Sequence, residues 1–389
     1  MIANSVKDVI HYLETFHANL PSISEILQEF HTLQEVWSEQ GEFGKKYAGT
    51  DLEIIGDLFD SFSLRKRILI ELGDEYALDG FTHRKGFKGR VHYAPLGKLL
   101  HISASNIALG LIDSMIMGVL SKNINIVKYS DITSDIVFEL QNSLEKYAPR
   151  IHSLVCFFKY RGGDKTIEKQ LFNLVDAVII WGGEEAIGNV KENLDYSKKL
   201  ITHGPKISFH VITQKGLEDL DYSQVVKDIT FYNQQACSSS QNIYLEASID
   251  RKKFLSELKN AWFYTRENLD PNEYVEFLKE KQLDLYQEFL GQTPGIFTKD
   301  MSASLSSHNF PEPTALNGSV KIKSFDSLNG LKRSLNDFRF YLQSCGLETG
   351  VNERDQYAIA LSQVGVSRFC RAGEMLEGTL GAPHDGEFN

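Results

Sequence analysis

The sequence predicts an α/β protein built on parallel β-sheets. From about residue 98, short runs rich in apolar and β-branched residues alternate with stretches of helical periodicity. The predicted strands are largely continuous apolar runs, which is typical of strands covered by helices on both faces. The alternation resumes after Cys237, so we expect two α/β units with a junction between Gly204 and Ser240.

The first part of the chain, up to about Gly80, is predicted to be mostly helical. Residues 20–40 carry apolar side chains three and four apart behind Ser24, the N-cap candidate. Residues 81–97 contain glycine turns between short runs and predict a hairpin. The unit that follows has predicted strands at 99–103, 124–128, 153–158 and 176–181, and predicted helices from about 107 and at 134–148 and 164–175.

The second unit continues the same alternation. Its predicted strands are 206–212, 242–247, 319–325, 339–347 and 366–370, and its later predicted helices are 326–338 and 352–365. Asp250 caps one helix, and a longer helix runs from Asp270-Pro271 to Gly291. Residues 292–318 are rich in Ser, Thr, Pro and Asn and are predicted to form a loop.

Composition excludes several classes of protein. The 389 residues include 41 basic and 52 acidic side chains, a formal charge of −11. This balance predicts an acidic surface with no basic tract, which argues against nucleic acid or an anionic membrane as the main partner. The apolar fraction of 42% is ordinary for a folded globular protein. The segment 102–120 nears the length of a membrane span, but Asp113 and its polar first third favour a strand end followed by a buried helix.

Four cysteines without a CxxC pair indicate neither a disulfide framework nor a zinc site. Free thiols fit a reducing compartment, so we expect a cytoplasmic protein. The first residues lack the basic and apolar pattern of a signal peptide.

Cys237 is the strongest candidate for chemistry. It lies in FYNQQACSSSQN (231–242), among small and amide side chains rather than in an apolar run. That setting suits an accessible thiol that accepts and releases an acyl group. The alternative is a buried structural cysteine, a description that fits Cys156 in SLVCFF.

Three further candidate sites lie at the end of a predicted strand or just after it. Asn106 fits an N-cap best, and its amide could also donate to a developing oxyanion. Gly182 and Gly183, between a strand and a helix, would let a phosphate approach the helix N-terminus. Lys128 at a strand end could reach a ribose or phosphate, or cap an edge.

Taken in order, these segments resemble the aldehyde dehydrogenase superfamily. Within it, the sequence is similar to the LuxC-like acyl-CoA reductases, the long-chain reductases that supply fatty aldehyde for bacterial luminescence. The resemblance is carried by FYNQQACSSSQNIY, AVIIWGGEEAI (177–187), GPKISF (204–209) and PHDG (383–386), and it spans residues 99–386.

The resemblance implies an aldehyde-dehydrogenase-like fold. A Rossmann-like cofactor domain would comprise 99–203, with 1–80 as its helical N-terminal part, and 81–98 would be a small oligomerisation hairpin. The catalytic domain would be 204–370, followed by a C-terminal return segment, 371–389. We therefore expect a homo-oligomer. Because family members run beyond the point where this chain ends, a tail is expected to be missing.

The resemblance also assigns roles to residues. Cys237 takes the place of the acyl-accepting nucleophile, and Asn106 that of the oxyanion-hole amide. The positions implied to bind the cofactor are Ser105, Lys128, Ser130, Asp131, Gly182 and Gly183. The family implies NADPH. An acid at Asp131 would repel a 2′-phosphate, so NADH remains the alternative. No metal is implied.

The implied reaction is reduction of a fatty acyl thioester, either acyl-CoA or acyl-protein, to the aldehyde through an acyl-cysteine. An acyl-protein synthetase would be a partner. Thr202 stands where hydrolytic members carry the glutamate that activates water, so hydrolysis is not expected. One alternative is a cysteine acyltransferase without nicotinamide chemistry, with His203 as its nearest base candidate. A non-catalytic scaffold is the other. The sequence does not encode the acyl chain length in a readable way.

Overall fold

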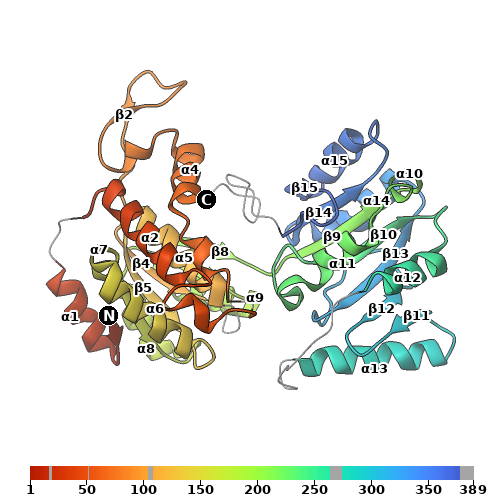
Figure 1. Cartoon of the computed structure of the whole chain (residues 1–389), viewed down its shortest axis with the longest axis horizontal. Coiled ribbons are helices and arrows are strands. Elements are labelled where there is room, and N and C mark those ends of the chain that lie inside the picture. Colours follow the sequence, from red (N-terminus) through yellow and green to blue (C-terminus); the bar gives the residue numbers. More distant parts are fainter. Residues whose placement is uncertain (17–19, 51, 104–107, 263–273, 377–389) are drawn as a thin grey trace. The chain divides into compact units, whose positions relative to one another are not determined.

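The structure, a computed structural model, describes residues 1–16, 20–50, 52–103, 108–262 and 274–376. The chain divides into two compact units, Met1–Gly204 and Pro205–Asn389. In Figure 1 the first unit runs from red to yellow-green and the second from green to blue.

The first unit contains a parallel sheet with strand order β1-β6-β5-β4-β7-β8. The strands are β1 (Ile2–Ala3), β4 (Lys98–Ile102), β5 (Ile124–Tyr129), β6 (Val155–Lys159), β7 (Ala177–Trp181) and β8 (Lys199–His203). The four central strands agree with the prediction. Both edge strands, β1 and β8, were missed, because an edge strand of two residues or of half-exposed residues carries little apolar pattern.

Helices cover both faces of this sheet. They are α1 (Val6–Thr15), α2 (Ile23–Trp37), α3 (Ile55–Leu58), α4 (Ser61–Leu72), α5 (Ala108–Leu120), α6 (Ser134–Tyr147), α7 (Pro149–Ser153), α8 (Lys165–Leu174) and α9 (Glu184–Asn193). Helices α2 to α7 share one apolar core, and α1, α8 and α9 share the other. The strand end and buried helix predicted for 102–120 are confirmed by β4 and α5.

The start of α2 corrects one prediction. The N-cap is Ser22, not Ser24, because the Ser22 hydroxyl accepts from the Glu25 backbone N–H. The Glu25 carboxylate in turn accepts from the Ser22 N–H at 2.8 Å, which completes a capping box.

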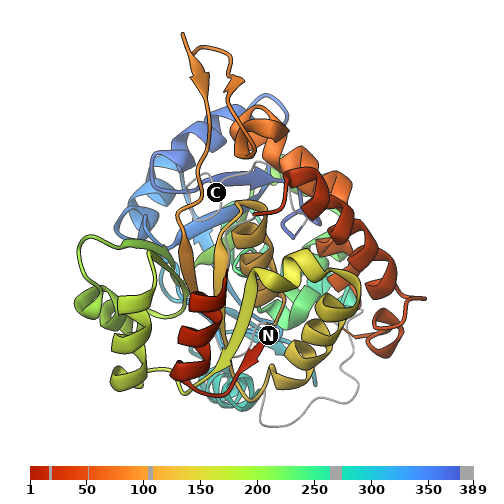
Figure 2. The ribbon, with the colours of Figure 1, turned by 90° about the vertical axis from the view of Figure 1, so that its left-hand side faces the viewer.

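The predicted hairpin is present as β2 (Thr82–His83) and β3 (Arg90–Val91), which pair antiparallel. Figure 2 shows it extending away from the helices of its own unit. Its basic side chains are Arg84, Lys85, Lys88 and Arg90. Basic residues are therefore clustered in this hairpin. The expectation that the chain has no basic tract is wrong here.

The second unit contains a sheet with strand order β11-β12-β13-β10-β9-β14-β15. The strands are β9 (Ile207–Ile212), β10 (Ser240–Glu246), β11 (Gly295–Phe297), β12 (Ser302–Leu305), β13 (Ser319–Phe325), β14 (Leu342–Glu348) and β15 (Arg368–Cys370). Among the described strand pairs of this second sheet, β11 and β12 run antiparallel and the others run parallel.

Two of these strands, β11 and β12, lie inside the predicted loop 292–318, and that prediction was wrong. Ser302 and Ser304 of β12 can be buried because their hydroxyls both donate to the Asp284 carboxylate. The Lys321 ammonium of β13 donates to the same carboxylate. A serine-rich strand is stable here because a buried acid satisfies its hydroxyls.

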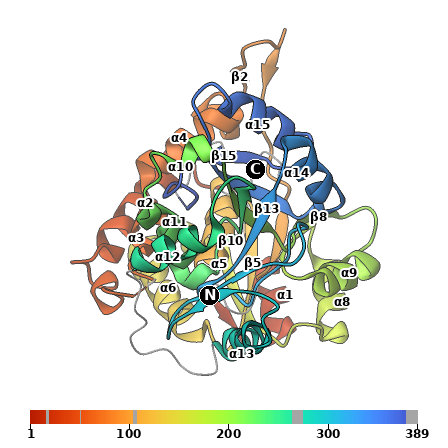
Figure 3. The same cartoon turned by 90° about the vertical axis from the view of Figure 1, so that its right-hand side faces the viewer.

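Helices of the second unit are α10 (Gln214–Leu217), α11 (Tyr222–Thr230), α12 (Arg251–Asn260), α13 (Val275–Phe289), α14 (Leu328–Leu335) and α15 (Arg354–Ser362). Helices α11 and α12 pack on one face, and α14 and α15 on the other (Figure 3). The predicted cap Asp250 and end Gly291 are confirmed, whereas Asp270 and Pro271 lie outside the described residues. Among the helices described, none is long and apolar enough to cross a membrane.

Candidate functional site

Cys237 lies on a loop between α11 and β10, at the edge of the second sheet where β9 and β10 begin. Its side chain is partly exposed. The Ser208 hydroxyl on β9 donates to the Cys237 carbonyl oxygen at 2.8 Å and accepts from the Ser344 N–H at 3.2 Å. The backbone of the cysteine is thus fixed to two neighbouring strands, β9 and β14, which anchors the loop that carries the thiol.

The other three cysteines are buried. Desolvation raises the pKa of Cys156 and that of Cys370 to about 12, and it raises the pKa of Cys345 well above the ordinary thiol range. A thiol with such a pKa is almost entirely protonated at neutral pH and is a poor nucleophile. Of the four cysteines, Cys237 is the one that is not buried.

A Ser–His–Asp arrangement lies behind the Cys237 loop. His210 Nδ1 is 2.8 Å from Ser240 Oγ, and His210 Nε2 is 3.1 Å from Asp228 Oδ2. All three side chains are fully buried, and the Asp228 carboxylate also accepts from the N–H groups of Gly373 and Met375. This arrangement therefore serves packing: it ties the start of β10 to α11 and to the segment after β15.

In the first unit, Lys128 is the penultimate residue of β5, near the edge where the parallel strands terminate. Its side chain lies over the Tyr160 ring at 5.9 Å. A Cβ placed at Gly162 would come within 3.7 Å of Lys128 Nζ. Burial lowers the pKa of the Lys128 ammonium. The Ser103 hydroxyl at the end of β4 donates to the Lys128 carbonyl oxygen at 3.4 Å.

Ser130 and Asp131 follow Lys128 along the chain. The Ser130 N–H donates to Thr133 Oγ1 at 3.1 Å, and this turn leads into α6. The Asp131 carboxylate is exposed and forms an ion pair with Lys159 at the end of the neighbouring strand β6. The negative charge of Asp131 is therefore opposed by a cation on the same edge of the sheet.

Gly182 and Gly183 connect β7 to α9. The Gly182 N–H donates to the His203 carbonyl oxygen at 3.1 Å, and Gly183 occupies the N-cap of α9. A Cβ placed at Gly183 would meet nothing within 4 Å, so the backbone at the start of α9 is open to a ligand. The His203 ring stacks on Trp181 across β7 and β8 with centroids 3.9 Å apart.

The strand order of the first sheet shows where a ligand would bind. The chain proceeds from β4 to β5 and β6 on one side and then returns to place β7 and β8 on the other side of β4. In open parallel sheets, ligands bind beyond the carboxyl ends of the strands at such a reversal. Lys128 and the two glycines lie on this edge. Ser105 and Asn106, which would follow β4, lie outside the described residues, as does PHDG at 383–386.

Sequence reasoning missed several residues of both sites. Gly162 and Gly163 follow β6 as Gly182 and Gly183 follow β7, and the same strand–glycine–helix signal would have found them. Ser208 contacts the Cys237 backbone only through tertiary folding, so no local signal marks it.

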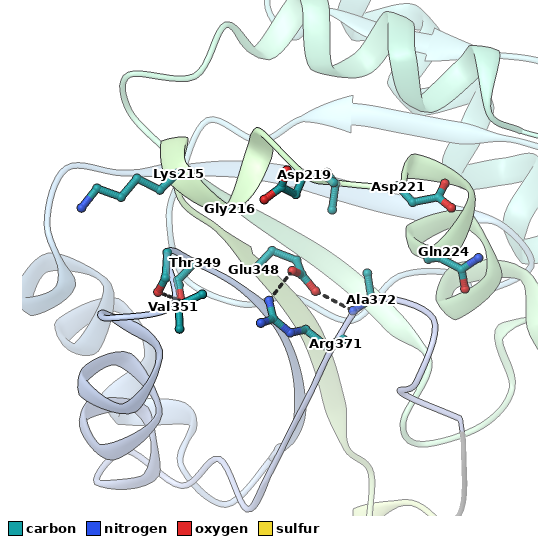
Figure 4. A pocket seen from close by; sticks show the side chains of 12 residues that line it. Lys215, Gly216, Asp219, Asp221, Gln224, Glu348, Thr349, Val351, Arg371 and Ala372 are labelled. Carbon is teal, nitrogen blue, oxygen red and sulfur yellow. Dashed lines mark hydrogen bonds and ion pairs between the residues drawn. The ribbon is translucent and has the colours of Figure 1, made fainter.

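A pocket of about 380 Å³ lies at the opposite edge of the second sheet, beyond the ends of β9 and β14. Figure 4 shows Glu348 and Arg371 side by side in its lining, joined by a dashed line. The Glu348 carboxylate accepts from Arg371 Nη1 at 3.0 Å and from the Ala372 N–H at 2.7 Å. The Glu348 carboxylate is therefore already hydrogen-bonded to Arg371 and Ala372. The residues that line this pocket do not include the Cys237 loop.

Curated relatives are long-chain acyl-protein thioester reductases. That of Photobacterium phosphoreum is 29% identical over 60% of this chain and 44% of its own length. That of Photorhabdus luminescens is 25% identical over 73% of this chain and 62% of its own. A second enzyme of this name, from Photobacterium leiognathi, is 32% identical over 39% of this chain and 32% of its own. The matches thus cover about one third to two thirds of the relatives.

Solved structures of similar fold include aldehyde dehydrogenases. A salicylaldehyde dehydrogenase from Pseudomonas putida aligns with a TM-score of 0.74 at 12% identity, covering 100% of this chain and 87% of the other. A glyceraldehyde-3-phosphate dehydrogenase from Methanocaldococcus jannaschii, solved with NADP, gives 0.72 at 12% identity over 98% and 89%. These confirm the aldehyde-dehydrogenase-like fold. The family model described as acyl-CoA reductase (LuxC) matches residues 2–389, and the chain therefore belongs to that family.

Proposed function

We propose that this protein reduces a fatty acyl thioester to the fatty aldehyde, using a nicotinamide cofactor and an acyl-enzyme at Cys237. The observation that carries the proposal is the contrast among the four cysteines: three are buried with raised pKa values, and Cys237 is partly exposed on an anchored loop. Membership in the LuxC family supports the same chemistry.

The first step is acyl transfer. The Cys237 thiolate attacks the thioester carbonyl carbon, the tetrahedral intermediate collapses, and the donor's thiolate leaves, so that one C–S bond replaces another. In this proposal Asn106 donates to the oxyanion, a role that rests on the family resemblance. Thr202, on β8, offers no carboxylate for activating water, which supports an acyl-enzyme that waits for reduction rather than hydrolysis.

The residues at the end of the first sheet fit a dinucleotide. Lys128 supplies a cation, and Gly162, Gly182 and Gly183 supply close backbone approach on one edge. When bound, a reduced nicotinamide supplies hydride to the acyl carbon. We propose NADPH, with NADH as the alternative. Because Lys159 pairs with Asp131, the acid repels a 2′-phosphate less than it would alone.

The donor and the partners follow from the relatives. Their names specify acyl-protein thioesters, so we propose an acyl-protein or acyl-CoA donor, with an acyl-protein synthetase as partner. We also propose a cytoplasmic homo-oligomer. A cysteine acyltransferase would need a base for its thiol. The ring of His203, the candidate base, stacks on Trp181. His210, which bonds Ser240 at the start of β10, is buried and also held by Asp228, which disfavours that alternative.

The test is intact-mass analysis after mixing the protein with long-chain acyl-CoA and no nicotinamide. We expect one acyl adduct on the parent protein and on Cys156→Ala, the matched control at a buried thiol, and none on Cys237→Ala. An acyl adduct on a cysteine of the Cys237→Ala protein would contradict the proposal.

A further inference from the structure

The backbone before Cys237 has an unusual conformation. Tyr232, Asn233 and Gln234 have φ values of 52°, 53° and 63°, in the left-handed region that non-glycine residues rarely adopt. Leu316 and Asn317, on the segment that leads into β13, have φ values of 58° and 56°. Within the described part of the chain, these are five of the six non-glycine residues with positive φ. Such strain persists only where surrounding contacts enforce it.

Gln234 supplies those contacts. Its side chain is fully buried and makes every hydrogen bond that an amide can make with its two donors and two acceptor sites. Nε2 donates to the carbonyl oxygens of Ser240 at 2.6 Å and Ser319 at 2.8 Å. Oε1 accepts from the N–H groups of Gly318 at 2.9 Å and Ser319 at 3.1 Å. One side chain therefore joins the loop to the first residues of both β10 and β13.

The two strained segments also bind each other directly. The Asn317 N–H donates to the Asn233 carbonyl oxygen at 3.1 Å. Downstream, the Cys237 carbonyl oxygen is held by Ser208. The stretch that carries the thiol is thus anchored at Gln234 on one side and at Ser208 and Ser240 on the other, with few residues between.

We propose that Gln234 is a positioning residue for Cys237: its four hydrogen bonds hold the left-handed turn that sets the place and direction of the thiol. The inference rests on the proposed function in that it names the residue that aligns the nucleophile of that reaction. Gln234 contacts no reacting atom. It acts through the backbone of Gln235 and Ala236, which connect it to Cys237.

The experiment compares Gln234→Met and Gln234→Glu with the parent. Methionine keeps the length of the side chain and removes all four bonds, whereas glutamate keeps the acceptors for the Gly318 and Ser319 N–H groups. Gln141→Met is the matched control, because Gln141 is a buried glutamine whose amide is 2.7 Å from His152 Nε2 in the first unit. All rates are measured at temperatures where each variant is folded.

Two readouts are used. The first is the rate and pH profile of Cys237 alkylation by iodoacetamide, located by peptide mass. The second is kcat and KM for acyl-CoA reduction. For Gln234→Met we expect kcat to fall on the order of 10²-fold with little change in KM, since a small misplacement of a reacting group costs this much. Its alkylation profile should shift, with Gln234→Glu intermediate and Gln141→Met like the parent.

Parent-like alkylation and kcat in a folded Gln234→Met protein would overturn the proposal, even if its melting temperature fell. If Gln234→Met does not fold, Gln234→Glu decides by the same criteria. A parent protein that takes up no acyl group would refute the proposed function, while the iodoacetamide comparison would still test the role of Gln234.

Discussion

His101, at the residue scale, shows how burial fixes the state of a titratable group. Asn125 donates through Nδ2 to the carbonyl oxygens of Asn123 at 2.8 Å and Leu154 at 3.3 Å, so its Oδ1 faces His101 Nε2 at 2.9 Å as an acceptor. The Nε2 atom must therefore carry the proton, and Nδ1 accepts from the Ser114 hydroxyl at 2.8 Å. The imidazole is neutral, and desolvation lowers the pKa of His101 from 6.5 to about 4.

This pKa predicts a pH dependence of stability. Because the folded pKa lies below the unfolded one, the unfolded state binds the proton more readily, and stability is lost as the pH falls from 6.5 toward 4. At about 1.4 kcal/mol per pH unit, His101 should contribute a loss of roughly 2 kcal/mol between pH 6.5 and 5. Urea unfolding at both pH values should show a smaller loss in His101→Gln than in the parent. Equal losses in the two proteins would refute the assignment.

The residues around Cys237 in the sequence predict that this cysteine is less buried than Cys156. They do not predict which side chains anchor its loop. Small and amide neighbours distinguish Cys237 from Cys156, which lies in an apolar run and is buried as expected. Gln234 and Ser208 read as ordinary polar residues in the sequence. Their roles depend on Ser319 and Ser344, which lie far along the chain and become neighbours only when the second sheet forms.

At the scale of elements, helix α5 packs closely on the buried side chains of His101 in β4 and Asn125 in β5. A Cβ placed at Gly118 would come within 1.9 Å of Asn125 Oδ1 and 3.0 Å of His101 Nε2. The helix can therefore approach β4 and β5 only because this residue has no side chain.

We predict opposite effects for two glycine-to-alanine changes in helices. Gly118→Ala should destabilise the protein by about 1–3 kcal/mol through overpacking. Gly188→Ala in α9, where a Cβ meets nothing within 4 Å, should be neutral or stabilising by up to about 1 kcal/mol, since alanine is the better helix former. Denaturant midpoints compare the two directly. A Gly118→Ala protein as stable as Gly188→Ala would contradict the packing described for α5.

Element prediction succeeded where apolar patterning is strong and failed where polar groups are buried. The central strand β7 is a continuous apolar run, and β6 is one up to its last residue. The serine-rich composition around β12 predicts a loop. The strand forms because Asp284 accepts hydrogen bonds from its serines, and the local sequence does not reveal this partner. Ser22 rather than Ser24 caps α2 because the capping box needs an acid three residues later, which is Glu25.

For the whole molecule, the alternation of strands and helices predicted two parallel α/β units, and motif order predicted the superfamily. The strand order could not be read from the sequence, because which strands become neighbours depends on tertiary packing. The reversal beside β4 is therefore a structural finding, and it places Lys128 and Gly182 on the same carboxyl edge as the cofactor proposal requires.

The most direct test of the central claim follows the hydride. Acyl-enzyme is formed from long-chain acyl-CoA, excess donor is removed, and NADPH deuterated at the transferable position is added. The account predicts that the adduct persists until the nucleotide is added and then leaves as aldehyde carrying one deuterium at C1. Release of unlabelled fatty acid, or loss of the adduct without nucleotide, would contradict it.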